Sequence, residues 1–316
     1  MRRNAIIGGF LWSGLLAGNL ADKFAFAWIE LLFLFAPLVI VPLGLELIAR
    51  IEKGTAPPLL ERIARSMHLP AALLCLGSFF FDASAPAAIL AAGWLAFSSL
   101  LALAGLLRVF RGAWRNLHSA IPALAFIYLA VGALWLVASR YGLEPLHFQE
   151  PIVLLTAVHF HFAGFGAPLL ARSVGRAFVS PNPRRALEIG YRVVATGVLL
   201  GPGLLAAAFL INPRFKLLAA LVLSASEVGL AALFLLALQR VQGIAARVLI
   251  GIAASSVIFS MVLAALWAIG EYPMQPFVGL GEMARLHGTV NAFGFTLCGL
   301  LGWTLTAKPR SVEGSN

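Results

Sequence analysis

Two histidines lie one residue apart in an otherwise apolar stretch, "TAVHFHFAGFGAPLL" (residues 156–170). His159 and His161 titrate near neutral pH and are common metal ligands, so they could exchange a proton or bind a metal ion. Four further polar side chains also stand in apolar surroundings: Glu30, Glu227, His287 and Asn291. What these six groups can do depends on the elements that position them.

The composition places these elements in a membrane. Of the 316 residues, 61% are hydrophobic and 11% are charged, whereas a soluble domain has about 45–50% apolar and about 25% charged residues. Residues 87–107 form a largely apolar run without a charged residue, and about 20 such residues suffice for a helix to cross a bilayer. The sequence therefore predicts an all-α fold, a polytopic bundle of transmembrane helices.

The apolar runs predict about ten spans, at residues 5–21, 24–48, 66–82, 86–107, 119–139, 151–171, 190–211, 217–238, 248–270 and 286–307. With the N-terminus inside, 18 of the 23 Lys and Arg residues fall in inner segments and 5 in outer ones. Because basic residues collect on the cytoplasmic side, both termini are predicted inside. Residues 66–82 form the weakest span and could be re-entrant instead. Residues 1–307 are expected to form a single transmembrane domain, and residues 308–316 a flexible cytoplasmic tail.

The net charge of +10 would suggest nucleic acid as the partner of a soluble protein. In a membrane protein the same charge is explained by basic loops that face anionic lipid, so the lipid bilayer is the expected partner and nucleic acid is not. Phosphate-binding glycine loops, serine-hydrolase elbows and His-Glu-x-x-His motifs are absent from the sequence, which argues against an ATP-driven pump and a membrane metalloprotease.

The polar groups fall at similar depths along helices that run in the same direction. Counted from the predicted outer end of its span, Glu30 is about six residues in, His159 about eight, Glu227 about ten and Asn291 about five, at a rise of 1.5 Å per residue. All lie between the outer interface and the middle of the membrane. Because ionisable groups are costly in hydrocarbon, we expect them to converge in one site that faces the outside.

Helical spacing refines this picture. His287 and Asn291 are four residues apart and share a helix face. His159 and His161 are two apart, about 200° around an ideal helix. We therefore expect one of these two rings to face the site and the other to support it or pack against a neighbour. Pro168 predicts a kink just after the pair.

The segments "VHFHFAGFGAPLLA" (158–171) and "RLHGTVNAFGFTLCGLLGW" (285–303) resemble the YndJ-like family of bacterial membrane proteins, which have a His-Phe-His segment and a later His-Gly-x-x-Asn segment. On this resemblance His159, His161, His287 and Asn291 match the polar positions of the family. The resemblance implies a multi-pass protein of the bacterial inner (plasma) membrane and a transporter without a settled substrate.

Two functions fit these residues. In the first, a secondary transporter or permease binds a small solute or ion: Glu30 and Glu227 carry the charge, His159 or His161 binds the ion or proton, and Asn291 orients it. In the alternative, a membrane enzyme or electron carrier holds a metal or haem through His159, His161 and His287. The sequence leaves open whether the protein is an enzyme and whether it has a cofactor.

Overall fold

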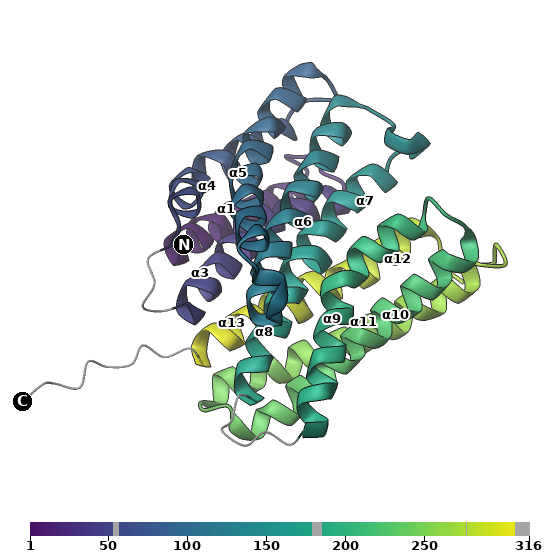
Figure 1. Ribbon diagram of the computed structural model, residues 1–316. Coiled ribbons are helices and arrows are strands. Elements are labelled where there is room, and N and C mark those ends of the chain that lie inside the picture. Colours follow the sequence, from purple (N-terminus) through teal and green to yellow (C-terminus); the bar gives the residue numbers. More distant parts are fainter. Residues whose placement is uncertain (53–56, 179–184, 276, 307–316) are drawn as a thin grey trace, which may run out of the picture.

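The computed structural model describes residues 1–52, 57–178, 185–275 and 277–306. Within them the chain forms ten long helical rods joined by short turns, with no strand (Figure 1). The first five rods are α1 (Arg2–Leu20), α2–η1–α3 (Trp28–Phe35, Ala36–Ile40, Val41–Ile51), α4 (Leu59–Ser78), α5 (Ala85–Phe110) and α6 (Leu117–Tyr141). The second five are α7–η4–α8 (Ile152–His159, Phe160–Gly166, Ala167–Phe178), α9 (Arg185–Ala208), α10–η5 (Pro213–Ala237, Leu238–Arg240), α11 (Ile244–Glu271) and α12–η6–α13 (Leu280–Thr289, Val290–Leu297, Cys298–Thr306). The short 3-10 turns are η2 (Ala113–Arg115) and η3 (Pro145–His147).

The prediction of an all-helical membrane bundle is confirmed, and its count of about ten spans agrees with the ten rods of the described residues. Seven of these rods are long and apolar enough to cross a membrane; α1, α4 and α12–η6–α13 fall short of that standard. α4 corresponds to the span at 66–82 that the sequence marked as weakest. The tail predicted at 308–316 lies outside the described residues.

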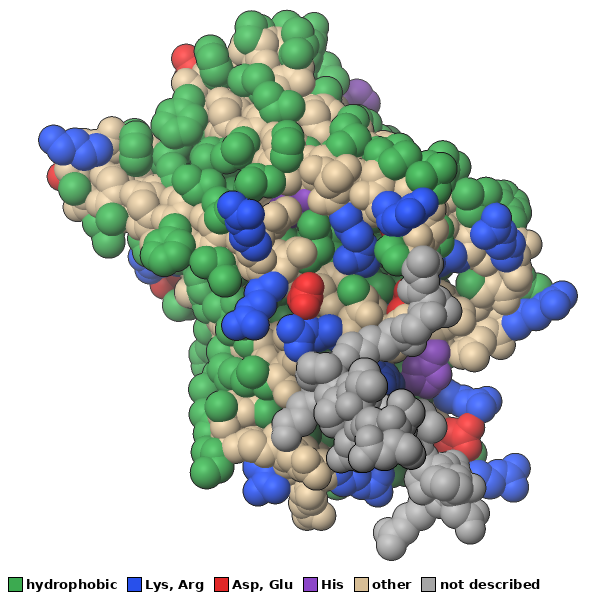
Figure 2. Space-filling view, turned by 90° about the vertical axis from the view of Figure 1, so that its left-hand side faces the viewer, with side chains coloured by type: hydrophobic (Ala, Val, Ile, Leu, Met, Phe, Trp, Pro, Cys, Tyr) green, Lys and Arg blue, Asp and Glu red, His purple; other side chains and the backbone are tan. Residues whose placement is uncertain are grey.

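The two ends of the described chain lie on the same side of the bundle. The amino group of Met1 is 4.0 Å from Glu46, and the Arg50 guanidinium donates to the carbonyl of Thr304 at 3.4 Å. Lys and Arg side chains gather on this side (Figure 2). We call it the basic face, and since basic residues collect on the cytoplasmic side of membrane proteins, we predict that it is the inner face of the bundle.

The α2–η1–α3 rod lies at the centre of the bundle. The most apolar window of this rod is 94% buried inside the protein, against 33% for α9 and α11, so the rod is shielded from lipid on nearly every side. α1 packs so closely on it that a Cβ at Gly8 would come within 1.8 Å of the carbonyl oxygen of Leu38. Only glycine allows this approach of two helix backbones.

Three rods contain a π-helical segment near their middle: η1, η4 and η6. η1 packs against η4, and η4 against η6. In η1 the carbonyl of Ala36 accepts a hydrogen bond from the N–H of Val41. The carbonyl of Pro37 has no equivalent donor, because Pro42 lacks an N–H. His68 of α4, which is buried, hydrogen-bonds that carbonyl at 3.1 Å through Nε2. The prolines therefore explain both the π turn and the histidine beside it.

Candidate functional site

A cavity of about 230 Å³ lies in the half of the bundle away from the basic face. Four of the six predicted side chains line it: His159 at the end of α7, Glu227 in α10, His287 in α12 and Asn291 in η6. The cavity also extends along α10 from Lys216 to Glu227, eleven residues or about 16 Å of helix. The structure thus brings together side chains from rods that are far apart in sequence.

Glu227 lies at the deep end of this cavity. It is 3% exposed, and no hydrogen bond or ion pair joins its carboxylate to a residue that the structure describes. Ser224, one turn earlier in α10, lines the cavity beside it. An ionised carboxylate in such surroundings is costly unless it has a partner, so Glu227 is a natural position for a bound proton or a cation.

The two neighbouring histidines have different surroundings. His159 lines the cavity, and its buried Nε2 has no partner within the described part of the chain. His161 is fully buried, accepts a hydrogen bond at Nε2 from the indole of Trp94 at 2.9 Å and contacts the carbonyl of Ala157 through Nδ1 at 2.7 Å. Because a carbonyl only accepts, His161 carries its proton on Nδ1. Both ring nitrogens of His161 are therefore used within the protein, and only His159 is available to a ligand.

His287 and Asn291 form a hydrogen-bonded group with Ser260 of α11. Nδ1 of His287 is 3.0 Å from the carbonyl of Ser260 and 2.9 Å from its hydroxyl. The amide nitrogen of Asn291 is 3.0 Å from Nε2 of His287 and 2.5 Å from the Ser260 hydroxyl. The Asn291 carbonyl oxygen is buried without a partner among the described residues. This group fixes the wall of the cavity and leaves one amide oxygen free.

Glu30 lies apart from this cavity. Its carboxylate accepts a hydrogen bond from the backbone N–H of Ala27 at 2.9 Å and lies 3.9 Å from Arg140 of α6. The first interaction caps the start of α2 in the way that a glutamate at the third helical position commonly does. Glu30 therefore has a structural use at the outer end of the helix.

Two charged residues of the cavity were missed by the sequence analysis as site residues. Lys216 and Glu271 both line it and form an ion pair of 3.0 Å between the start of α10 and the end of α11. Tyr272, beside them, also lines the cavity. Opposite charges at the outer ends of two consecutive helices could have indicated this pair, because consecutive rods are neighbours in an antiparallel bundle.

The ligands needed for a metal do not come together in the described ranges, where no group of three His, Cys, Asp or Glu side chains is close enough to hold an ion. His161 has both ring nitrogens engaged, and those of His287 contact Ser260 and Asn291. Cys75 is buried and Cys298 is half-buried, both as free thiols. A haem bound between two imidazoles would therefore require the groups around His287 or His161 to rearrange.

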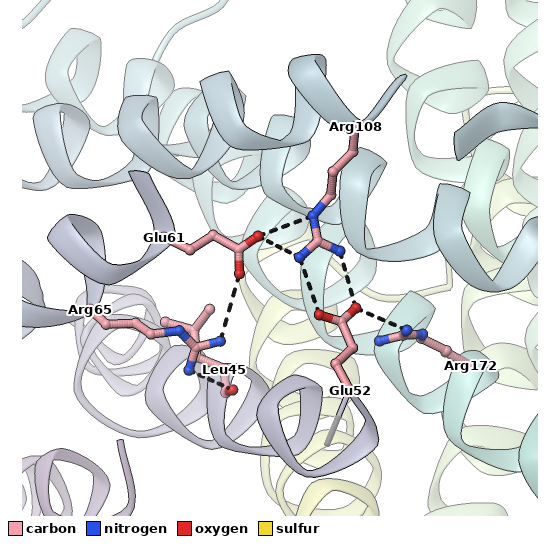
Figure 3. Close-up of polar contacts among 6 residues, drawn as sticks. All are labelled: Leu45, Glu52, Glu61, Arg65, Arg108 and Arg172. Atoms are coloured by element: carbon pink, nitrogen blue, oxygen red, sulfur yellow. Dashed lines mark hydrogen bonds and ion pairs between the residues drawn. The ribbon is translucent and has the colours of Figure 1, made fainter. Parts of the chain in front are cut away.

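A second polar cluster lies at the basic face (Figure 3). Arg108, at the end of α5, donates to Glu61 of α4 from Nε at 3.0 Å and to Glu52 from both terminal nitrogens at 3.0 and 3.2 Å. Arg172 of α8 reaches the same Glu52 at 3.0 Å, and Arg65 lies 3.9 Å from Glu61. Four rods are joined by these contacts, and we call the five residues the inner ion network.

Glu52 lies just beyond the end of α3, outside the membrane-spanning segment. Burial raises the pKa of this carboxyl, but the hydrogen bond and charge of Arg108, together with those of Arg172, outweigh burial and hold the pKa below its usual value. Glu52 is therefore ionised at neutral pH, and its negative charge is held by two of the three arginines of the network.

Comparisons with known proteins agree with this architecture. The model of the YndJ-like protein family matches residues 31–295. A relative from Bacillus subtilis (strain 168), "Uncharacterized membrane protein YndJ", is 26% identical over 314 residues, which are 99% of this chain and 55% of that protein. The chain thus spans about half the length of this relative. No solved structure matches. The described chain contains several helices able to span a membrane, it is an integral membrane protein, and it belongs to the YndJ-like family.

Proposed function

We propose that this protein is a permease of the bacterial inner membrane, in which a small cationic solute and a proton compete for Glu227. The observation that carries the proposal is the placement of this carboxyl: it is 3% exposed, lines a cavity and has no partner among the described residues. A buried carboxylate without a partner needs either a proton or a cation. Exchange of one for the other is the elementary step of proton-coupled transport.

The other cavity residues have complementary roles in this proposal. His159, whose Nε2 is unpartnered among the described residues, accepts or donates a hydrogen bond to the solute. The free carbonyl oxygen of Asn291 is a second acceptor, held in place through Ser260 and His287. The Lys216–Glu271 pair lies on the route between Glu227 and the outer end of the bundle.

The metal- or haem-binding alternative has less support. Of the three predicted ligands His159, His161 and His287, only His159 has a ring nitrogen that the described residues leave free, and a metal centre needs several such donors at once. The geometry therefore favours the binding of an organic or inorganic cation over coordination chemistry.

Reconstituted vesicles with a pH-sensitive dye inside test the proposal. Sodium, potassium, methylammonium and tetramethylammonium ions are added outside in turn, and proton exit is recorded. We expect at least one of them to drive proton exit from wild-type vesicles. The Glu227→Gln variant should lose at least nine-tenths of this flux, while Glu188→Gln, at a partly exposed glutamate of α9 paired with Arg192, should keep it.

Equal flux in the Glu227→Gln and wild-type vesicles would overturn the proposal, as would proton exit with none of the four cations. Labelling by a carbodiimide, which reacts with protonated carboxyls in apolar surroundings, gives a second readout. Glu227 should be labelled, and an excess of the active cation should protect it.

A further inference from the structure

A second cavity, of about 600 Å³, adjoins the one that contains Glu227. It lies among the outer ends of α6, α7, α9 and α11 and the turn η3. The two cavities share part of their walls, namely Leu155, His159, Leu205, Phe209, Trp267 and Glu271. His159 is therefore at the junction between a small, partly polar cavity and a larger one. We call the larger one the side cavity.

The lining of the side cavity is almost entirely apolar. Besides the shared residues it includes Trp135, Phe148, Phe160, Pro202, Ala206 and Leu210. Three of its polar side chains are engaged within the protein: the hydroxyl of Thr156 donates to the carbonyl of Ile152 at 2.8 Å, the indole of Trp267 donates to the carbonyl of Val278 at 3.2 Å, and Glu271 pairs with Lys216 at 3.0 Å. The free Nε2 of the shared His159 lies at the junction with the smaller cavity. Its volume is within the range of about 300–1,000 Å³ that is usual for small-molecule sites.

The border of the side cavity reaches the surface through apolar side chains. Leu146 is 58% exposed, Leu210 59% and Met274 86%, and all three belong to its lining. They are on turns at the end of the bundle opposite the basic face. An exposed apolar border around an apolar cavity favours ligands that arrive from the membrane or its interface rather than hydrated ions.

We infer that the two cavities together bind one amphiphilic cation, with its charged head beside Glu227 and His159 and its hydrocarbon part in the side cavity. This inference rests on the proposed function for the head and names the substrate class: an organic cation that carries an alkyl or aryl chain. Because Glu227 is the unpaired charge at the deep end, a cationic head is favoured over an anionic one. Because the side cavity offers almost no free hydrogen-bonding group, its occupant is hydrocarbon.

Binding of an alkyl series tests the inference. Tetramethylammonium, butyltrimethylammonium and hexyltrimethylammonium are titrated by calorimetry into the protein held in phosphatidylcholine nanodiscs, with empty nanodiscs as the reference. Each buried methylene should tighten binding about fourfold. We therefore expect hexyltrimethylammonium to bind at least tenfold more tightly than tetramethylammonium, and hexyl sulfate to bind more weakly than its cationic counterpart.

Two neighbouring alanines of α9 supply a matched pair of variants. Ala206 lines the side cavity but not the cavity that contains Glu227, whereas Ala207 is exposed and lines neither. Ala206→Phe should fill the side cavity and abolish the dependence on chain length while binding of tetramethylammonium persists. Ala207→Phe should behave as wild type, which shows that a phenyl group on this helix does not disturb the fold.

Glu227→Gln separates the head from the tail. We expect it to weaken binding of all three cations by a similar factor and to leave the dependence on chain length intact. Affinity that does not change with chain length, or a dependence that survives Ala206→Phe, would overturn the inference even if tetramethylammonium drives proton exit from vesicles. Conversely, chain-length dependence without any cation-driven proton exit would leave this binding site standing and refute the proposed transport.

Discussion

Glu61 and Glu227 are two buried glutamates in the same bundle with opposite surroundings. Glu61 is fully buried at the basic face and contacts Arg108 and Arg65. Glu227 is 3% exposed in the other half and has no partner among the described residues. The comparison teaches that burial alone does not mark a functional carboxyl. Glu61 is paired with its neighbours and joins helices, whereas Glu227 lines a cavity without a partner among the described residues, as the proposed function requires.

The same contrast recurs between His161 and His159, only two residues apart. His161 has hydrogen-bonding contacts at both ring nitrogens and packs edge-on against Phe33 at 5.0 Å. A Cβ at Gly132 would come within 2.7 Å of its Nδ1, so α6 fits closely around the ring. His159 has no such partners and lines both cavities. In both pairs, one side chain has hydrogen-bonding or ionic partners within the protein, and the other lines a cavity without such a partner among the described residues.

The largest effect on stability is expected at the inner ion network. Arg108→Ala removes the main partner of the buried Glu61, and a buried charge that loses its partner costs about 3–5 kcal/mol. Unfolding in mixed micelles measures this change. Arg192→Ala is the control, because Arg192 and Glu188 form an exposed i,i+4 pair, and such pairs contribute less than about 1 kcal/mol. Equal effects of the two substitutions would mean that the network does not hold the rods together.

A smaller effect on the free energy of unfolding is expected from loss of the hydrogen bond to His161. Trp94→Phe keeps the aromatic packing but leaves Nε2 of His161 without its donor, and an unsatisfied buried group costs about 1–3 kcal/mol. Trp303→Phe is a close match, because Trp303 is 4% exposed and its indole nitrogen has no partner in the described chain. If both substitutions shift the unfolding midpoint equally, the hydrogen bond to His161 contributes nothing.

The inner network should also respond to acid. The pKa of Glu52 is lower in the folded protein than in the unfolded chain, where it is about 4.3. Its stabilising contribution is therefore fully present above that pH and is lost as the pH falls through the lower folded pKa. The difference in melting temperature between wild type and Glu52→Gln should shrink between pH 5 and pH 3. A constant difference over this range would show that Glu52 does not titrate against its arginines.

The smallest effect on stability is expected at the other glutamate. Glu227→Gln breaks no hydrogen bond or ion pair with a described residue and replaces an ionisable group by a neutral one of similar shape. We expect the free energy of unfolding to change by less than about 1 kcal/mol, while cation-driven proton exit is lost. A loss of stability as large as that of Arg108→Ala would erase the contrast between the two glutamates.

The sequence predicts the membrane architecture well because hydrocarbon imposes long apolar runs and an excess of basic residues on one side. Depth in hydrocarbon, where ionisable groups are costly, likewise indicated His159, Glu227, His287 and Asn291, which line one cavity in the structure. It could not separate Glu30, because a glutamate at the start of a helix and one inside a cavity are equally close to the outer end when only depth is counted.

Other features depend on contacts that a single sequence does not reveal. The Lys216–Glu271 pair joins two helices whose facing sides are not fixed by hydropathy. The contacts of Glu61 and Arg108 are set by how α4 packs on α5. The spacing of His159 and His161 did predict that they face different ways, since angular separation is a property of the helix itself.

The π-helical segment η4 of the α7–η4–α8 rod fixes how the half of the rod at the Glu227 cavity is rotated relative to the half at the inner ion network. Upstream of Phe160–Gly166, His159 faces the cavity; downstream, Arg172 reaches Glu52 on the opposite side of the bilayer. Deleting a single residue between them would rotate one half of the rod by about 100° relative to the other. After such a rotation, His159 could not line the cavity while Arg172 still paired with Glu52. The π-helical segment therefore keeps the two halves of this rod in the orientation that both contacts need.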